Sequence, residues 1–269
     1  MRPGIATLIC CGLVSMAWPG LSARAQELAR APELIPGWTL LVSPYGWAAS
    51  LRGKGSLAGV STHIDVPFSE ILDHLDIAVM GNVEATNGRF GFYLDGQYVE
   101  TSQTEQLYRH RIAVGITTTR LSAGVFFKLH EIALEGTTVF GRPRTISFEP
   151  TAGVRWTKLA GDIGVLGIGF GKSSDWYDPF IGLRINADLT DRWNLFAEAD
   201  AGGTGPSQYS LQGQVYLGYR TLLFGHETVL RAGYRAIYQN YQAEDFTRRG
   251  RFRWDVTQHG PAFGLTMRF

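Results

Sequence analysis

The sequence predicts an all-β protein that folds as a closed antiparallel transmembrane β-barrel of about 12 strands, within a range of about 10 to 14, with a short helix near 68–75. Three observations support this prediction: an N-terminal export signal, alternation of apolar and polar residues, and a C-terminal strand that ends in phenylalanine. The 269 residues suffice for one large domain or two small ones. The 25 Lys+Arg against 24 Asp+Glu argue against a nucleic-acid binder, and 45% apolar residues exclude a disordered chain.

Residues 1–25 have the three parts of a secretory signal peptide. Arg2 supplies the positive charge, 5–14 form the apolar stretch, and 23–25 have the small-x-small pattern of a cleavage site. Both cysteines leave with this segment, so the exported chain, which begins with a periplasmic segment at 26–37, contains none. Because a secreted domain of this size has no disulfides, other interactions must hold it together.

From residue 38 to the end the apolar residues recur with period two, which predicts the barrel domain over 38–269. In 179–189 the odd positions are apolar, while the even positions include Arg184 and Asp188. The pattern returns in 193–201, and the turn residues between the two segments predict a hairpin. The strands predicted in this way are 38–51, 57–66, 76–86, 89–100, 109–127, 146–157, 161–171, 177–189, 192–203, 208–222, 227–241 and 253–269.

The segment 109–127 leaves the strand count open. Its apolar residues occupy even positions up to Ile116 and odd positions from Leu121 onward, which indicates a β-bulge or a turn. A turn at 117–119 would make 131–140 a further strand and raise the count to about 14.

One segment has helical spacing instead of period two. Phe68, Ile71, Leu72 and Leu75 would lie on one face of a short amphipathic helix, for which Ser69 is placed as the N-cap. Such a helix either plugs part of the barrel lumen or caps its rim, and a helical turn at the rim is the more common arrangement in short connections.

The C-terminus indicates which face of the strands meets water. Alternation alone fits both a soluble barrel with an apolar core and a transmembrane barrel with an apolar lipid face. The last strand carries on its apolar face the residues of a Gram-negative outer-membrane insertion signal: Phe263, Leu265, Met267 and Phe269. We therefore expect export to the bacterial outer membrane. The expected partners are outer-membrane lipid and, during insertion, the barrel-assembly machinery, with no nucleic acid and with the oligomeric state left open.

Short motifs recur through most of the exported chain. They are 44–47 (PYGW), 153–156 (GVRW), 178–184 (DPFIGLR), 191–193 (DRW), 200–203 (DAGG), 217–220 (LGYR), 233–235 (GYR) and 260–261 (GP), followed by the final Phe269. With these motifs the chain resembles a family of proteobacterial outer-membrane β-barrel proteins to which no activity is assigned. The resemblance implies the fold and the compartment. The sequence departs from the family pattern in the Gly-rich stretch 157–176, where strand pairing is open.

If the apolar faces meet lipid, a set of charged residues projects into the lumen. These candidate lumen-lining residues are Glu84, Asp95, Arg155, Arg184, Asp188, Glu198, Asp200, Arg220, Arg231, Arg235 and Arg268. They could form a cross-strand ladder that closes the barrel, or they could line a passage that selects small polar solutes. The ladder is favoured, because charges kept away from lipid must be paired or hydrated in any such barrel.

The sequence predicts no catalytic residue, cofactor or metal site. The Gly-rich run 167–173 lacks the first glycine of a phosphate-binding loop and the helix that must follow it. His63 and Asp65 share one face of a strand, but no serine stands at a spacing typical of outer-membrane hydrolases. The six histidines are scattered, and His130, His226 and His259 are expected in loops or at the membrane interface.

The leading hypothesis is a structural or small porin-like barrel that passes small polar solutes. A second hypothesis is an outer-membrane enzyme acting on lipid or envelope substrates, which would require Ser or Asp to converge with His at one rim. A third is a soluble exported ligand-binding barrel, which would purify without detergent.

Overall fold

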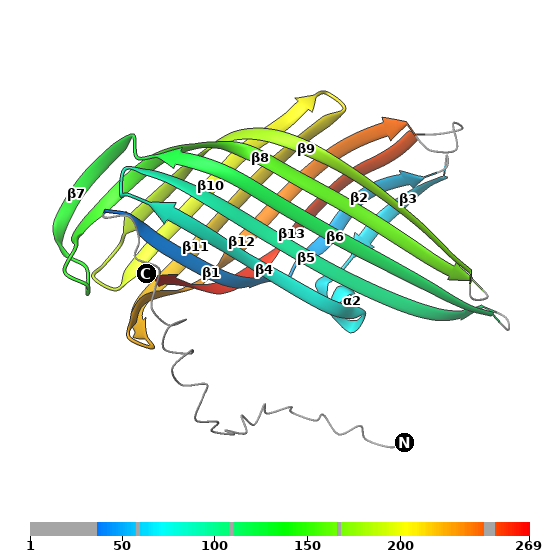
Figure 1. Ribbon diagram of the computed structural model, residues 1–269, viewed down its shortest axis with the longest axis horizontal. Helices are drawn as coiled ribbons and strands as arrows, with labels where there is room; N and C mark the ends of the chain where they lie inside the picture. Colours follow the sequence, from blue (N-terminus) through cyan, green and yellow to red (C-terminus); the bar gives the residue numbers. More distant parts are fainter. Residues whose placement is uncertain (1–36, 58–59, 108–109, 166–167, 245–250) are drawn as a thin grey trace, which may run out of the picture. The chain divides into compact units, whose positions relative to one another are not determined.

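The computed structural model describes residues 37–57, 60–107, 110–165, 168–244 and 251–269. The predicted signal peptide and the segment up to residue 36 lie outside the described residues. The described part contains thirteen strands and one short helix (Figure 1).

Ten strands form a closed antiparallel barrel. In ring order they are β1 (Thr39–Trp47), β4 (Leu75–Thr86), β5 (Phe90–Leu107), β6 (His110–Phe127), β8 (Pro143–Val165), β9 (Ile168–Asp188), β10 (Trp193–Gly205), β11 (Gln208–Leu223), β12 (His226–Glu244) and β13 (Arg251–Arg268). β1 closes the ring because it pairs with β4 on one side and with β13 on the other. Where β13 ends beside β1, Phe269 and Leu40 exchange two backbone hydrogen bonds of 2.9 and 3.2 Å.

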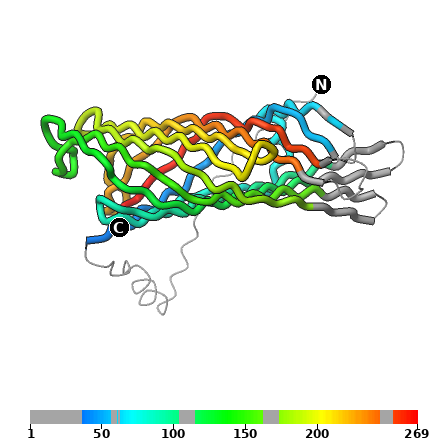
Figure 2. The backbone as a smooth tube through the Cα atoms, turned by 90° about the horizontal axis from the view of Figure 1, so that it is seen from above, coloured from blue at the N-terminus to red at the C-terminus, as the bar shows by residue number. Residues whose placement is uncertain are grey.

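Three further strands lie outside this ring: β2 (Ser50–Leu57), β3 (Val60–Val66) and β7 (His130–Thr137). β2 pairs with β13, which is also the partner of β1. β3 in turn pairs with β2. β7 pairs with the beginning of β8. The beginning of β1 and the last residue lie at one end of the barrel, which we call the terminal end; β2 and β3 lie at the other, the distal end (Figures 1 and 2).

The expectation of about twelve barrel strands is therefore wrong, and two differences account for it. The predicted strand 57–66 corresponds to β3, which lies outside the ring. The predicted strand 161–171 is no separate strand, because 161–165 continue the predicted strand 146–157 as the end of β8 and 168–171 begin β9. β8 pairs with β9 in continuous register from Ile146 to Val165. The Gly-rich stretch is thus part of one long hairpin, because alternation weakens where glycines replace side chains without ending the strand.

β6 contains neither the predicted bulge nor the predicted turn at 117–119. It pairs with β5 residue by residue over its whole length and with β8 over Ile112 to Phe126, without a register shift. Ile116 therefore has the same parity as the inward-pointing Arg120, yet Ile116 is 48% exposed while Arg120 is 2% exposed. The apolar residues change sides because the strand extends past the packed part of the barrel, where the inward face need not be polar.

The predicted helix exists as α2 (Phe68–Asp73), but its cap differs from the prediction. Pro67 occupies the N-cap position with φ −69°, and its carbonyl accepts hydrogen bonds from Glu70 and Ile71, without a side-chain cap from Ser69. None of the residues of α2 is buried, so it does not pack into the barrel as a plug. No helix in the described part of the chain is long and apolar enough to cross a membrane.

The barrel is apolar outside and polar inside. Outward residues such as Val79, Phe92 and Val215 are exposed large hydrophobics, whereas inward Arg155 and Gln239 are almost completely buried. Outward aromatic pairs flank the apolar band. Trp193 and Tyr219 meet near the terminal end with ring centroids 5.0 Å apart, and Tyr209 and Tyr238 meet near the distal end at 5.7 Å. This band between two aromatic girdles is typical of transmembrane barrels.

Phe263 of the predicted insertion signal is 59% exposed on the outward face of β13. Its neighbour Ala262 points inward and is fully buried. The apolar face predicted for this strand is therefore the outer one, and its role in insertion stays a prediction.

We expect Val215→Arg to destabilise the barrel by about 2–4 kcal/mol, because Val215 lies midway between the two girdles on β11 and an arginine there would meet hydrocarbon. Thr221→Arg, on the same face but beyond Tyr219, should cost only about 0–1 kcal/mol. Denaturant unfolding in lipid vesicles measures both changes. Equal losses for the two variants would contradict a lipid-facing band.

Candidate functional site

The barrel interior is crossed by polar side chains that connect opposite walls. Arg120 of β6 donates to Gln97 Oε1 at 3.0 Å, and on the far side to Gln239 Oε1 at 2.9 Å and Gln258 Oε1 at 2.7 Å. β6 and β12, which carries Gln239, occupy opposite positions in the ten-strand ring. Gln239 also donates to Thr157 Oγ1 at 3.1 Å on β8. This set of bonds therefore spans the full width of the lumen.

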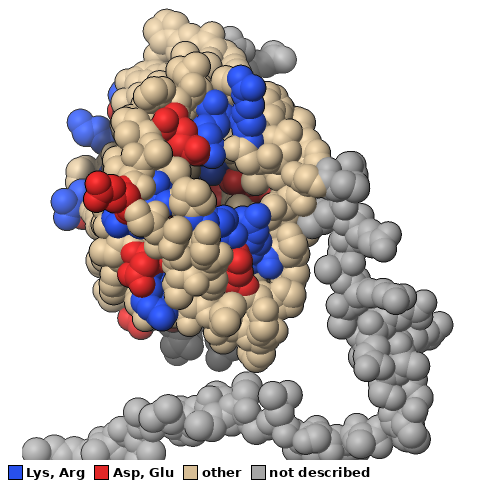
Figure 3. Space-filling model, turned by 90° about the vertical axis from the view of Figure 1, so that its left-hand side faces the viewer, with Lys and Arg blue, Asp and Glu red and all other residues tan. Residues whose placement is uncertain are grey.

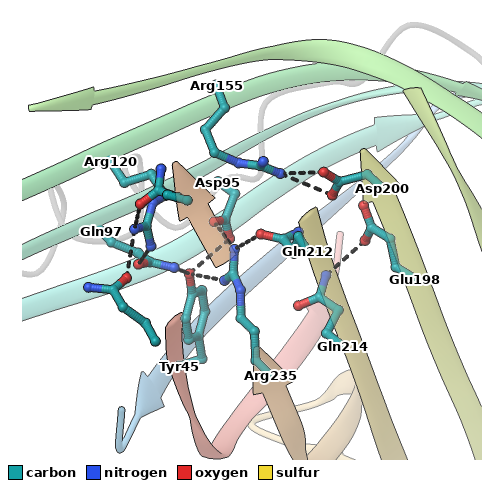
Figure 4. Close-up of polar contacts among 12 residues, drawn as sticks. Tyr45, Asp95, Gln97, Arg120, Arg155, Glu198, Asp200, Gln212, Gln214 and Arg235 are labelled. Carbon is teal, nitrogen blue, oxygen red and sulfur yellow. Dashed lines mark hydrogen bonds and ion pairs between the residues drawn. The ribbon is translucent and has the colours of Figure 1, made fainter. Parts of the chain in front are cut away.

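A second arginine, Arg235 of β12, ties the same level to β1 and β5 (Figure 4). Its guanidinium donates to Tyr45 Oη at 2.9 Å, to Asp95 Oδ1 at 3.2 Å and to Gln212 Oε1 at 2.9 Å. Tyr45 in turn donates to Asp95 Oδ2 at 2.9 Å and accepts from Gln97 at 3.0 Å. Because Gln97 contacts Arg120 as well, both arginines belong to one network.

Arg155 of β8 forms the most buried ion pair. Its Nη2 donates to both carboxylate oxygens of Asp200, at 2.8 and 3.0 Å, and its Nη1 donates to Ser210 Oγ at 3.1 Å. The side chains of Arg155 and Asp200 are 1% and 0% exposed. Such a pair is stable only when further hydrogen bonds satisfy the remaining polar atoms, and Ser210 supplies one of them.

Further ion pairs lie in the interior towards the terminal end. Arg184 pairs with Glu84 at 2.7 Å, and its guanidinium lies 4.0 Å from the centroid of the Phe126 ring. Nearer the rim Arg220 pairs with Asp188. At the rim itself Arg268 donates to Thr39 at 2.9 Å and lies 3.7 Å from Glu227.

A cavity of about 90 Å³ lies between this region and the network. It is lined by residues of all ten barrel strands, among them Glu84, Asp95, Arg184, Glu198, Arg231 and Arg235. Figure 3 looks onto the terminal end, where acidic and basic side chains surround a hollow at the centre of the barrel.

The structure places the predicted lumen charges at three levels. Around the central network and the cavity it brings together Glu84, Asp95, Arg155, Arg184, Glu198, Asp200, Arg231 and Arg235. Arg220 and Asp188 pair with each other between this level and the terminal rim. Arg268 lies at the rim, apart from the rest.

Several buried polar residues of the interior were not predicted from the sequence. Glu149 and Asp178 are buried inside and have the same strand parity as Arg155 and Arg184, so the period-two pattern contained the signal that would have found them. Arg120 lies in the segment where the apolar residues change sides, and there the pattern gave no such signal. The glutamines that accept hydrogen bonds from Arg120 are uncharged and belong to no recognised motif, so the sequence did not point to them.

The histidines remain separate from one another. Asp65 pairs with Arg52 at 3.2 Å on the exposed β2–β3 hairpin, while His259 bonds the Tyr234 hydroxyl at 2.7 Å. His130 and His226 contact the rings of Phe148 and Phe269. His110 lies outside the residues whose side chains are described. In the described part of the chain no group of three or more His, Cys, Asp or Glu could hold a metal ion.

A closed ring of antiparallel strands with an apolar exterior and a charged interior defines a transmembrane β-barrel protein. Solved structures similar to this chain are outer-membrane barrels. The protease OmpT of Escherichia coli matches with a TM-score of 0.52 and 10% identity, over 87% of this chain and 97% of that chain. The attachment invasion locus protein Ail of Yersinia pestis matches with a TM-score of 0.36 and 10% identity, over 86% and 98%.

The translocator domain of the autotransporter NalP from Neisseria meningitidis matches with a TM-score of 0.34 and 11% identity, over 93% of this chain and 94% of that chain. No protein-family model and no curated protein matches the sequence. The chain thus has the fold of a transmembrane β-barrel, while at 10% identity the likeness to OmpT transfers no activity.

We expect Arg155→Met to lower the free energy of unfolding by about 3–5 kcal/mol, because it leaves the Asp200 carboxylate buried without a partner. The double variant Arg155→Met/Asp200→Leu should recover most of this loss, since the uncompensated charge is removed as well. Denaturant titrations of both variants and of Asp200→Leu complete a double-mutant cycle. Additive losses would show that the pair is not coupled.

Proposed function

We propose that this protein is a structural outer-membrane barrel whose lumen is closed at its middle, and not a constitutively open pore. The observation that carries the proposal is the burial of the central inward side chains. Arg120, Arg155 and Gln239 are only 1–2% exposed. In a water-filled channel the residues lining the lumen would be in contact with solvent along its length, as in porins.

The pairing of the charges supports the same proposal. Lumen charges that conduct ions bind them weakly enough to release them. Here Arg155 and Arg235 are both engaged with carboxylates of other strands, and Arg120 is held by three glutamines. A solute would have to break several buried hydrogen bonds to pass, each exposing a polar group that costs about 1–3 kcal/mol to leave unsatisfied.

The proposal retains the structural half of the leading hypothesis and gives up steady solute passage. The soluble barrel loses support because many large apolar residues are exposed on the outer face of the strands. We also propose that the protein is not an enzyme, because the interior carboxylates are paired with arginines or hydrogen-bonded to side-chain amides.

Single-channel recording in a planar bilayer tests the closed lumen. We expect the refolded wild type, with insertion checked by its heat-dependent gel mobility, to give no stepwise conductance. Arg120→Ala/Gln239→Ala should conduct, because it removes the bond that spans the ring between β6 and β12, together with the other bonds of both side chains, and shortens the side chains in the central network.

Arg253→Ala is the matched control, since its arginine pairs with Asp255 outside the central network. It should remain silent like the wild type. Stepwise conductance of the wild type would overturn the proposal, and silence of the inserted double variant would show that the Arg120 network is not the barrier.

A further inference from the structure

We propose that the cavity on the terminal side of the network binds a small oxyanion, such as phosphate or a short carboxylate, with Arg231 as its principal ligand and Arg184 as the second. This inference goes beyond the closed scaffold and does not depend on it, since a site of this kind would exist in an open or a closed barrel.

Arg231 lines the cavity without a hydrogen-bonding partner among the described residues. The carboxylates of the cavity already have partners: Glu84 pairs with Arg184, Asp95 with Arg235, and Glu198 accepts from Gln214 at 2.8 Å. Arg231 also lines the cavity, but among the described residues it makes no hydrogen bond or ion pair. Its protein contact is the face of the Phe196 ring, 5.3 Å from the guanidinium. The buried Nε of this guanidinium has no acceptor in the protein, and the neighbour of the group is an aromatic ring.

Arg184 lines the same cavity as Arg231. Its guanidinium lies 5.4 Å from the centroid of the same Phe196 ring, so both arginines contact one side chain and face one cavity. Arg184 uses Nη2 for Glu84, whereas its buried Nη1 has no hydrogen-bond acceptor in the protein. Both arginines line the same cavity and each has a nitrogen without an acceptor, a combination that suits the several acceptor oxygens of a phosphate or carboxylate.

The charged lining and the volume of the cavity also suit a small anion. Four arginines and three carboxylates line the cavity: Arg155, Arg184, Arg231 and Arg235 against Glu84, Asp95 and Glu198. Arg155 has its own partner in Asp200, which leaves Arg231 as the lining arginine without an ion pair among the described residues. The cavity volume of about 90 Å³ exceeds what a single water requires, and small hydrogen-bonding side chains such as Ser43 and Asn82 complete its wall. The hollow at the terminal end seen in Figure 3 offers a way in.

Isothermal titration calorimetry of the refolded chain in detergent, with inorganic phosphate as the probe, tests the site. We expect saturable binding to the wild type. Arg231→Gln should weaken it at least about tenfold, the loss expected for a charge-assisted hydrogen bond worth about 1.5–3 kcal/mol. Arg231→Lys should lose less, because it keeps the charge. Arg253→Gln, which alters an outward arginine of β13, should bind as the wild type does.

A second measurement does not rely on the folding of the Arg231 variants. If phosphate binds the folded state, it should raise the denaturation midpoint of the wild type with increasing concentration, and sodium chloride at equal ionic strength should not. Absence of saturable binding by the wild type, an equal effect of chloride, or undiminished binding by Arg231→Gln with native gel mobility would each overturn the proposal.

Discussion

The closure of the backbone ladder by β1 and β13 is the constraint on which the rest of the structure depends. In hydrocarbon every unpaired N–H or C=O group costs several kcal/mol, so strands can span a membrane only when the ring has no edge. β1 meets this requirement by pairing with β4 and β13, and the bonds between Leu40 and Phe269 continue the closure at the rim. Once the ring is closed, side chains alternate between lipid and lumen, and the period-two pattern follows.

Ring closure also determines what the interior must contain. A ten-strand ring is narrow enough for one long side chain to cross, and arginine combines that reach with several donors. Arg120 illustrates the consequence: it lies near the like charges of Arg235 and Arg155, and it is held by glutamine oxygens instead of a carboxylate. Neutral acceptors satisfy its donors, while the carboxylates serve the neighbouring arginines. The interior is thus a shared hydrogen-bond network more than a set of separate ion pairs.

The sequence predicted the outward faces better than the strand count, and the charges better than their partners. Period two identifies a strand and its two faces, so the inward position of Arg155 and Arg184 followed directly. It does not say where a strand leaves the ring, and β2 and β3 carry the same pattern outside it. Nor does it say which residues meet across the lumen. The contact of Arg120 with Gln239 joins strands on opposite sides of the ring, and that depends on strand number and stagger, which no local pattern encodes.

The position of the cavity follows from the sizes of side chains around the ring. On the adjacent strands β4, β1 and β13 the lining includes the small residues Asn82, Ser43 and Gly264. A side chain at Gly264 would collide with Tyr45, the residue that anchors Arg235, so this position must remain small for the network to form. At this position β13 therefore adds no side chain to the cavity. The same packing that blocks the middle of the lumen leaves a cavity beside it, and Arg231 is the arginine that faces this cavity without a partner.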